Sequence, residues 1–166
     1  MLFRSRHRQR QRGQYGLSFH IDFETVSSMA YSKPIPVPSE ESKPFWEATK
    51  RGELLLQHCR DCGAYRFPPN LLCTECSSTS FDWKCVSGRG KVYSYVVFHR
   101  AYHPAFAADL PYAVACIELE EGPRLMSNVV GIGPEQLRCD MPVEVVFEEI
   151  SSDISLPKFR QAGVKP

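Results

Sequence analysis

The sequence predicts a mainly β protein in three parts: an N-terminal helical segment, a small metal-binding ribbon and a C-terminal five-stranded barrel. Three observations predict this order. A short segment between Pro44 and Gly52 has helical signals, two Cys-x-x-Cys pairs follow it, and the remaining chain alternates strand-length apolar runs with glycine and proline turns. The length of 166 residues suffices for one ordinary domain or for two smaller modules.

The first part of the chain differs in charge from the rest. Residues 1–28 contain five arginines and two acidic residues, a formal charge of +3, whereas the whole chain carries +1. They lack the apolar core of a secretory signal. We expect residues 1–30 to be a basic, disordered tail, because nothing in them can build a core. On this interpretation Met29 could be the true start. A mitochondrial-type presequence and a nucleic-acid-binding arm are the alternatives.

Residues 31–52 predict an extended arm followed by a helix. Prolines at every second position from Pro34 to Pro38 favour an extended backbone without internal hydrogen bonds. Ser42 is then a suitable N-cap, Pro44 occupies the first turn where its missing N–H costs nothing, and Gly52 ends the helix. One face of this helix should be buried, and it holds Phe45, Ala48 and Thr49.

Four cysteines form the most specific motif of the chain. Cys59 and Cys62 make one Cys-x-x-Cys pair, and Cys73 and Cys76 make a second pair after ten intervening residues. Zinc takes four thiolates at tetrahedral corners, and Gly63 supplies the left-handed residue that such a turn needs. The four cysteines therefore predict one structural zinc ion that folds a module too small to have its own core.

The zinc ribbon is expected to span residues 53–87, with flanking strands near 54–57 and 81–86. Iron in a rubredoxin-like site and two disulfides are the alternatives for the same four thiols. Four cysteines leave no open coordination position for a catalytic zinc. Cys85 and Cys116 lie in apolar runs and are expected to be buried. Without a secretory signal, the cysteines favour a reducing, cytoplasmic setting.

The remaining residues, 88–163, predict a barrel of the oligonucleotide/oligosaccharide-binding (OB) type, because five short strands with one helical turn at 134–137 suit that architecture. The expected strands are 90–100, 112–118, 124–130, 143–149 and, more weakly, 155–160.

Sequence motifs for catalysis are missing. The chain has no phosphate-binding glycine loop and no nucleophile elbow. His99 and His103 flank a loop and could transfer protons or bind a ligand, but the simpler interpretation is that they are exposed residues at a strand end. His58 precedes a zinc ligand, but the four cysteines already fill the metal site. No stretch approaches the roughly 20 apolar residues of a membrane span. We therefore predict no catalytic residues and no membrane association.

The order of several motifs resembles the DUF35 family. These motifs run from Pro44-Phe-Trp-Glu-Ala and Gly52-Glu-Leu, through the four cysteines, to Gly90-Lys-Val-Tyr-Ser, Pro111-Tyr-Ala-Val-Ala, Glu121-Gly-Pro-Arg-Leu, Met141-Pro-Val-Glu-Val-Val-Phe and Leu156-Pro-Lys-Phe-Arg-Gln-Ala. The resemblance covers about residues 36–163. It implies a helical segment, a rubredoxin-like zinc ribbon and a C-terminal OB fold.

The resemblance also implies a function. Members of this family look like accessory subunits of acyl-CoA enzymes in lipid or steroid metabolism, which pair with thiolase-like proteins, lipid-transfer-type aldolases or hydratases. The partner carries the catalytic residues, and the OB domain is thought to help bind the CoA. A non-catalytic, acyl-CoA-binding subunit of a hetero-oligomer is therefore expected, and a heterotetramer of two partners and two accessory subunits is plausible.

If acyl-CoA is the ligand, the segment 98–106 is a plausible contact region because it combines basic and aromatic side chains. Arg100 could pair with a phosphate, while Tyr102 and Phe106 could cover the adenine or the pantetheine. Arg124 and Arg89 are second choices. Partner interface or ordinary surface is the alternative interpretation of this loop.

Zinc ribbons and OB barrels also serve in nucleic-acid-binding proteins, so this function is the main competitor. A nucleic-acid binder should present a basic stripe. Residues 29–166 carry a formal charge of −2, which disfavours nucleic acid as a partner unless the arginine-rich tail takes part.

Overall fold

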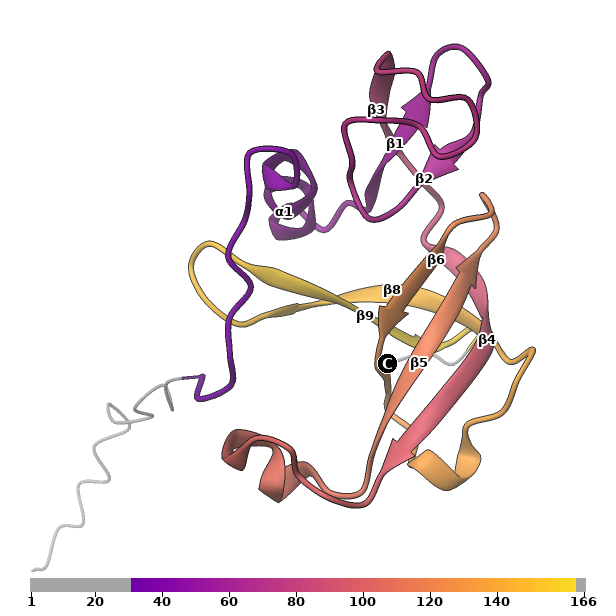
Figure 1. Cartoon of the computed structure of the whole chain (residues 1–166). Helices are drawn as coiled ribbons and strands as arrows, with labels where there is room; N and C mark the ends of the chain where they lie inside the picture. Colours follow the sequence, from indigo (N-terminus) through magenta and orange to yellow (C-terminus); the bar gives the residue numbers. More distant parts are fainter. Residues whose placement is uncertain (1–30, 164–166) are drawn as a thin grey trace, which may run out of the picture. The chain divides into compact units, whose positions relative to one another are not determined.

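The computed structural model describes residues 31–163, so the predicted tail over 1–30 lies outside the described residues. From Tyr31 onward the chain forms one compact unit. An extended arm leads to one α-helix, a three-stranded ribbon follows, and a six-stranded sheet curls into a barrel (Figure 1). The prediction of a mainly β chain is therefore confirmed. The domain boundaries drawn within this unit remain predictions.

Helix α1 (Lys43–Lys50) has the predicted buried face, since Phe45, Ala48 and Thr49 are all inaccessible. Ser42 is the N-cap residue, as predicted, but its hydroxyl makes no capping hydrogen bond to the helix. The hydroxyl instead accepts a hydrogen bond from the N–H of Ser39 at 2.9 Å.

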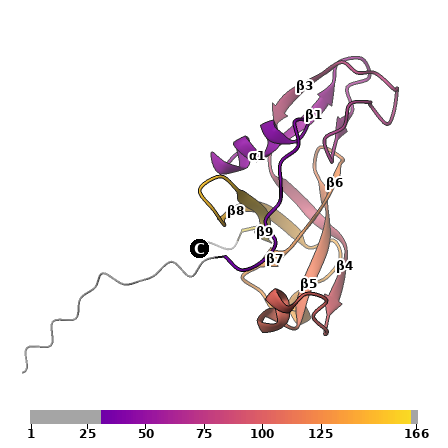
Figure 2. The same ribbon diagram turned by 60° about the vertical axis from the view of Figure 1, so that its left-hand side comes forward.

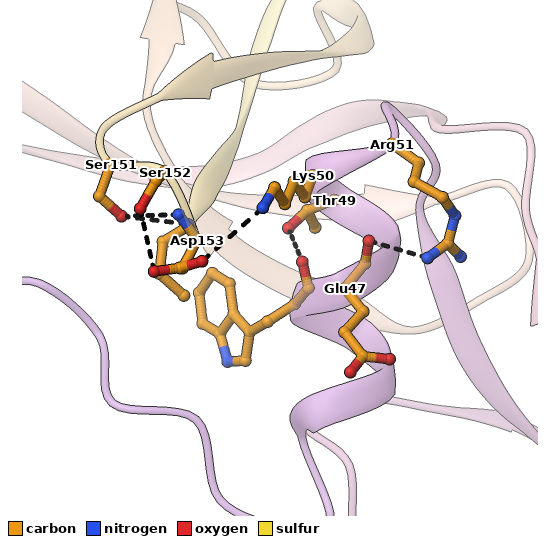
Figure 3. A network of polar contacts seen from close by, with 9 residues as sticks. Glu47, Thr49, Lys50, Arg51, Ser151, Ser152 and Asp153 are labelled. Atoms are coloured by element: carbon orange, nitrogen blue, oxygen red, sulfur yellow. Dashed lines mark hydrogen bonds and ion pairs between the residues drawn. The ribbon is translucent and has the colours of Figure 1, made fainter.

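A polar contact links the end of α1 to the loop between strands β8 (Pro142–Glu149) and β9 (Ser155–Gln161) (Figure 3). The ammonium of Lys50 lies 3.7 Å from the carboxylate of Asp153. Within the helix, the Thr49 hydroxyl donates to the carbonyl of Trp46 at 2.9 Å, and Arg51 donates to the carbonyl of Glu47 at 3.0 Å. Only the pair of Lys50 and Asp153 joins the helix to the barrel, and the other two bonds lie within the helix end.

The ribbon is an antiparallel sheet of β1 (Leu55–Cys59), β2 (Tyr65–Arg66) and β3 (Phe81–Cys85), in the order β2-β1-β3. Its central strand pairs with both neighbours. Cys85 is exposed and Cys116 is half-buried, so the expectation that both are buried is wrong for Cys85. Cys85 ends β3, whose last two residues are exposed.

The barrel contains the five predicted strands, with the third divided into two pieces. The pieces are β4 (Arg89–Phe98), β5 (Tyr112–Leu119), β6 (Arg124–Ser127), β7 (Val129–Val130), β8 (Pro142–Glu149) and β9 (Ser155–Gln161). Their order in the sheet is β6-β5-β4-β8-β9-β7. Two short 3₁₀ helices, η1 (Pro104–Asp109) and η2 (Pro134–Gln136), interrupt the connections, and η1 replaces the loop expected there.

The division of the predicted strand 124–130 closes the barrel. Its first half, β6, pairs antiparallel with β5, and its second half, β7, pairs parallel with β9. The change of partner occurs at Asn128, whose carbonyl accepts from the N–H of Phe159 at 2.9 Å and whose side-chain amide donates to the carbonyl of Ala113 at 2.7 Å. Figure 2 shows β7 beside β9 at this closure.

One hydrophobic core serves all three parts. Phe45 of the helix and Leu54 and Leu56 of the ribbon belong to the same buried cluster as Ile117 and Phe159 of the barrel. Because burial of apolar side chains is the main stabilising term, the shared cluster holds helix, ribbon and barrel together. Among the described residues, no helix combines the length and the apolar character needed to cross a membrane.

Candidate functional site

The four cysteines of the ribbon form one cluster. Their sulfur atoms all lie within 4.8 Å of one another. The sulfur of Cys59 lies 3.6 Å from that of Cys76, and the sulfur of Cys62 lies 3.7 Å from that of Cys73. A tetrahedron with metal–sulfur distances of about 2.3 Å has edges of about 3.8 Å, whereas a disulfide has sulfurs about 2.05 Å apart. The cluster therefore fits one tetrahedral ion, which Zn²⁺ or iron would satisfy.

Both cysteine turns contain the same backbone hydrogen bond and a residue in the left-handed conformation. In the first turn the N–H of Gly63 donates to the carbonyl of Cys59 at 3.0 Å, and Gly63 has a φ of 75°. In the second turn the N–H of Ser77 donates to the carbonyl of Cys73 at 2.9 Å, and Ser77 has a φ of 60°. The left-handed position was predicted for Gly63 only. A serine gives little sequence signal for this conformation, because non-glycine residues adopt it rarely.

Backbone N–H groups prepare two of the sulfurs to act as thiolates. The N–H of Cys62 is the main cause that lowers the pKa of the Cys59 thiol to about 6, and the N–H of Glu75 is the main cause that lowers the pKa of Cys73. A backbone N–H also lowers the pKa of Cys62 and of Cys76, but neighbouring sulfurs and burial outweigh it and the net shift is upward. A bound cation would offset the repulsion between neighbouring thiolates and would allow all four cysteine thiols to ionise.

A cavity of about 540 Å³ lies at the opposite end of the barrel strands from the ribbon. The extended arm (31–36) forms one wall, and η1, the start of β5 and the η2 region form the others. Tyr31, Phe106, Tyr112 and Val129 give it a largely apolar lining. Its size and lining are typical of a small-ligand site.

A row of aromatic rings leads from the surface to this cavity. Tyr102, which is 79% exposed, lies edge-on to Phe98 with ring centroids 5.9 Å apart. Phe98 stacks on Tyr112 at 5.1 Å, and Tyr112 contacts Phe106 at 5.7 Å. The outer end of the row is open to solvent and the inner end lines the cavity.

Two lysines line the same cavity, and sequence reasoning missed both. The ammonium of Lys33 lies 2.6 Å from the carboxylate of Asp109 and 5.4 Å from the ring centroid of Phe106. The hydrogen bond to Asp109 is the main cause that raises the pKa of Lys33. Lys158 also lines the cavity and pairs with Glu148. No local pattern marked them, since the arm reaches this site only by tertiary packing.

The structure brings some of the predicted ligand-binding residues together. Phe106 lines the cavity, Tyr102 begins the aromatic row, and Arg100 is exposed on the same loop. His99 and His103 are exposed, and Nδ1 of His103 accepts a hydrogen bond from the N–H of Ala105 at 3.2 Å, where it caps η1.

Arg124 and Arg89 lie away from this cavity. Arg124 pairs with Glu118 across β5 and β6, at the opposite end of β5 from Tyr112. Its guanidinium carbon lies 3.4 Å from the ring centroid of Tyr93 and its Nη2 donates to Glu118 at 3.0 Å. Arg89 is paired with Glu120 at 3.0 Å. The structure therefore separates these two arginines from Arg100, Tyr102 and Phe106.

Replacement of Arg124 by methionine is expected to raise the pKa of Glu118 towards its usual value. The Arg124 guanidinium is the main cause that lowers the pKa of this carboxyl, and Lys91, 3.5 Å away, lowers it further. Because the folded-state pKa is lowered, the pair stabilises the protein above the ordinary carboxyl pKa, and this contribution is lost as the pH falls through the lowered value. Titration by NMR measures the shift, and Glu120 is the internal control. An unchanged Glu118 pKa would contradict the pair.

Comparison with known protein families identifies both modules. The family described as "ChsH2, rubredoxin-like zinc ribbon domain" matches residues 46–82, and the family described as "ChsH2, C-terminal OB-fold domain" matches residues 83–148. The prediction of a zinc ribbon followed by an OB fold is thereby confirmed.

Individual relatives agree with this assignment. The chain is 42% identical over 132 residues to a probable enoyl-CoA hydratase alpha subunit of Thermomonospora curvata, covering 78% of this chain and 40% of that protein. It is 42% identical over 96 residues to a DUF35 domain-containing scaffold protein of Methanocaldococcus jannaschii, covering 57% of this chain and 67% of that protein. The solved structure "Ltp2-ChsH2(DUF35) aldolase" contains a chain that matches with 40% identity and a TM-score of 0.69, over 77% of this chain and 99% of that one.

Proposed function

This chain belongs to the DUF35 family of scaffold proteins, and from that premise we propose that it is a non-catalytic accessory subunit of an acyl-CoA enzyme. It binds the acyl-CoA at the barrel and holds a thiolase-superfamily partner, either a thiolase or a lipid-transfer-type aldolase, which carries the catalytic residues. The four cysteines hold one structural zinc ion.

The names of similar proteins support the role of a subunit. The Thermomonospora curvata relative is named an alpha subunit, and the similar solved structure is named as an aldolase of two components. This chain spans 40% of the length of the Thermomonospora curvata relative.

The aromatic row that ends in the cavity is the observation that carries acyl-CoA binding. The cavity of about 540 Å³ offers an apolar surface for the pantetheine and acyl parts, and the exposed end at Tyr102 offers a ring on which the adenine can stack. Arg100 on the same loop is a cation for the phosphates, whereas Lys33 at the cavity is already paired with Asp109. Apolar walls with a few charged groups match the mixed chemistry of a CoA thioester.

The shared core supports a scaffolding role. Because Phe45 of α1 and Leu56 of the ribbon are buried with the barrel residues, the zinc ribbon holds the helix in a constant position relative to the barrel. A partner that docks on the helix or ribbon would thus meet an acyl-CoA presented from a rigid support.

Replacement of Phe106 by alanine is expected to weaken acetyl-CoA binding about tenfold, because it removes one aromatic contact of about 1–3 kcal/mol. Calorimetric titration of the full chain with acetyl-CoA measures the change. Tyr93→Ala is the matched control, since that ring lies beneath Arg124, away from the cavity. If Tyr93→Ala weakened binding more than Phe106→Ala, the ligand would lie at the Arg124 end of the barrel.

The partner is tested by affinity capture from native lysate. Recovery of a thiolase-like enzyme is the expected result, and recovery of RNA-processing proteins instead would favour the nucleic-acid-binding alternative.

The purified chain by itself, without a partner, should show no turnover of acyl-CoA. Robust turnover without any partner would contradict a non-catalytic subunit.

A further inference from the structure

The extended arm, residues 31–38, belongs to no helix or sheet and borders the larger cavity. Figure 2 shows it running from α1 toward β7 and β9. Its side of the cavity is lined by Tyr31, Lys33, Pro34 and Pro36. The arm lines no part of the second cavity, of about 470 Å³, which Arg66 and Glu121 line beside the ribbon. Movement of the arm would therefore change the larger cavity and leave the second one intact.

Polar contacts hold the arm at two points. Next to α1, the N–H groups of Ser42 and Lys43 both donate to the carbonyl of Ser39, at 3.1 and 2.9 Å. At the cavity, the ammonium of Lys33 lies 2.6 Å from the carboxylate of Asp109. Within residues 31–163, no other hydrogen bond or ion pair joins residues 31–38 to the barrel. This ion pair is therefore the single polar attachment of the arm at its cavity end.

The ion pair lies where a ligand would enter. Lys33 belongs to the arm and Asp109 to η1, so the pair joins two walls of the cavity. The same ammonium lies 5.4 Å from the ring centroid of Phe106, the ring at which the aromatic row reaches the cavity. A ligand that follows the row inward from Tyr102 therefore has to pass this pair.

The arm is held weakly at its cavity end. The side chains of Lys33 and Asp109 are 27% and 36% exposed, and an ion pair that water reaches contributes little to stability. Ile35 and Val37 are 44% and 91% exposed, so they add little apolar packing. Segments with few buried apolar contacts open locally at a low cost in free energy. The cavity end of the arm can therefore detach while the rest of the chain stays folded.

Proline spacing makes the arm stiff between its two attachments. Pro34, Pro36 and Pro38 have a fixed φ, and each also restricts the preceding residue to extended conformations. The arm therefore bends little along its length. Rotation of the backbone at the turn of residues 39–42 would move its cavity end as a unit.

We propose that residues 31–38 form a strap over the larger cavity, which opens to admit a ligand and closes on it. The turn at residues 39–42 is the hinge, and the ion pair of Lys33 and Asp109 is the latch. The role of the strap in ligand entry rests on the acyl-CoA site proposed above. Opening itself is a property of the free chain, so it is measured without any ligand.

Opening is tested on the free full-length chain by NMR relaxation dispersion at the amide of Ile35, because lids move on the microsecond-to-millisecond timescale. Lys33→Met removes the latch charge and should raise the open population about two- to fivefold, the range expected for a partly exposed ion pair. Lys91→Met is the matched control, since Lys91 also pairs with carboxylates but does not line the cavity. An unchanged population in Lys33→Met, or no exchange at Ile35 in either protein, would overturn the strap.

A charge swap separates the ion pair from simple packing. Lys33→Asp combined with Asp109→Lys should restore the wild-type open population, because the two exchanged side chains can form the same pair. An open population that stays as high as in Lys33→Met would assign the effect to the packing of the lysine stem and would overturn the latch.

Ligand entry is tested by stopped-flow mixing of the full chain with acetyl-CoA. Lys33→Met should raise the association and dissociation rate constants together, about two- to fivefold, because the ligand enters and leaves through the same opening. A rise of the dissociation rate constant alone would make Lys33 a direct ligand contact and would overturn the gating role. Absence of acetyl-CoA binding to the wild-type chain would contradict the proposed function, whereas the dispersion measurement would still decide whether the strap opens.

Discussion

Replacement of Cys59 by serine is expected to release the metal and unfold the ribbon. A structural zinc in a peptide of this kind contributes about 10–16 kcal/mol of apparent binding free energy, and that energy is also the folding energy of the module. Cys59 ends β1, is fully buried and lies 3.6 Å from the sulfur of Cys76, so its loss opens both cysteine turns. Metal analysis should find about one zinc per wild-type chain and far less in the variant.

The consequences for assembly follow from the shared core. Leu54 and Leu56 of the ribbon belong to the buried cluster of the barrel, so an unfolded ribbon should also release α1 and abolish complex formation with the proposed partner. Cys85→Ser is the matched control, because Cys85 is exposed and lies outside the four-cysteine cluster. A Cys59→Ser variant that lost its metal yet assembled with full activity would show that the folded ribbon is not needed to hold the helix in position for the partner. Iron in place of zinc would appear as visible absorption in the purified wild-type protein.

Replacement of Phe159 by alanine is expected to lower the free energy of unfolding by about 3–5 kcal/mol, because it leaves a large cavity in a fully buried site. Phe159 is 0% exposed, and its position opposite Val129 in the parallel pair of β7 and β9 places it where the barrel closes. Domains of ordinary stability unfold with only about 5–15 kcal/mol, so this loss is a large fraction of the total.

Urea denaturation with saturating zinc measures this effect. Tyr102→Ala is the matched control, since that side chain is 79% exposed and its removal should cost little stability. A loss below about 1 kcal/mol for Phe159→Ala would mean that the closure relaxes to fill the space. Loss of acetyl-CoA binding in Tyr102→Ala without loss of stability would instead support the aromatic row as a ligand surface.

Local sequence patterns predicted the cysteine cluster and the buried face of α1. Two Cys-x-x-Cys pairs constrain four sulfurs within short turns, so their meeting needs little information from the rest of the chain. The face of α1 follows from helical periodicity for the same reason. The N-cap position of Ser42 was also predicted correctly, but its hydroxyl bonds to Ser39 and not to the helix, because a serine hydroxyl can bond to several nearby backbone groups.

Other features could not be predicted from local patterns. The segment 124–130 has the composition of a single strand, but Asn128 divides it because its two halves pair with β5 and with β9, some thirty residues later in the chain. The structure also separates ligand-binding residues that were predicted together from composition. Arg124 lies at one end of β5 and Phe106 near the other, a separation that only strand register defines.

The sequence by itself determined the four-cysteine cluster, the mainly β class and the family, because these depend on residue types at short fixed spacings. Tertiary structure alone decided that the arm carries Lys33 to the wall of the larger cavity, that the barrel closes at Asn128, and that Arg66 and Glu121 line a second cavity. Each of these features joins residues more than 25 positions apart. Their proximity follows from how the strands pair and how the shared core packs, and neither can be read from neighbouring residues.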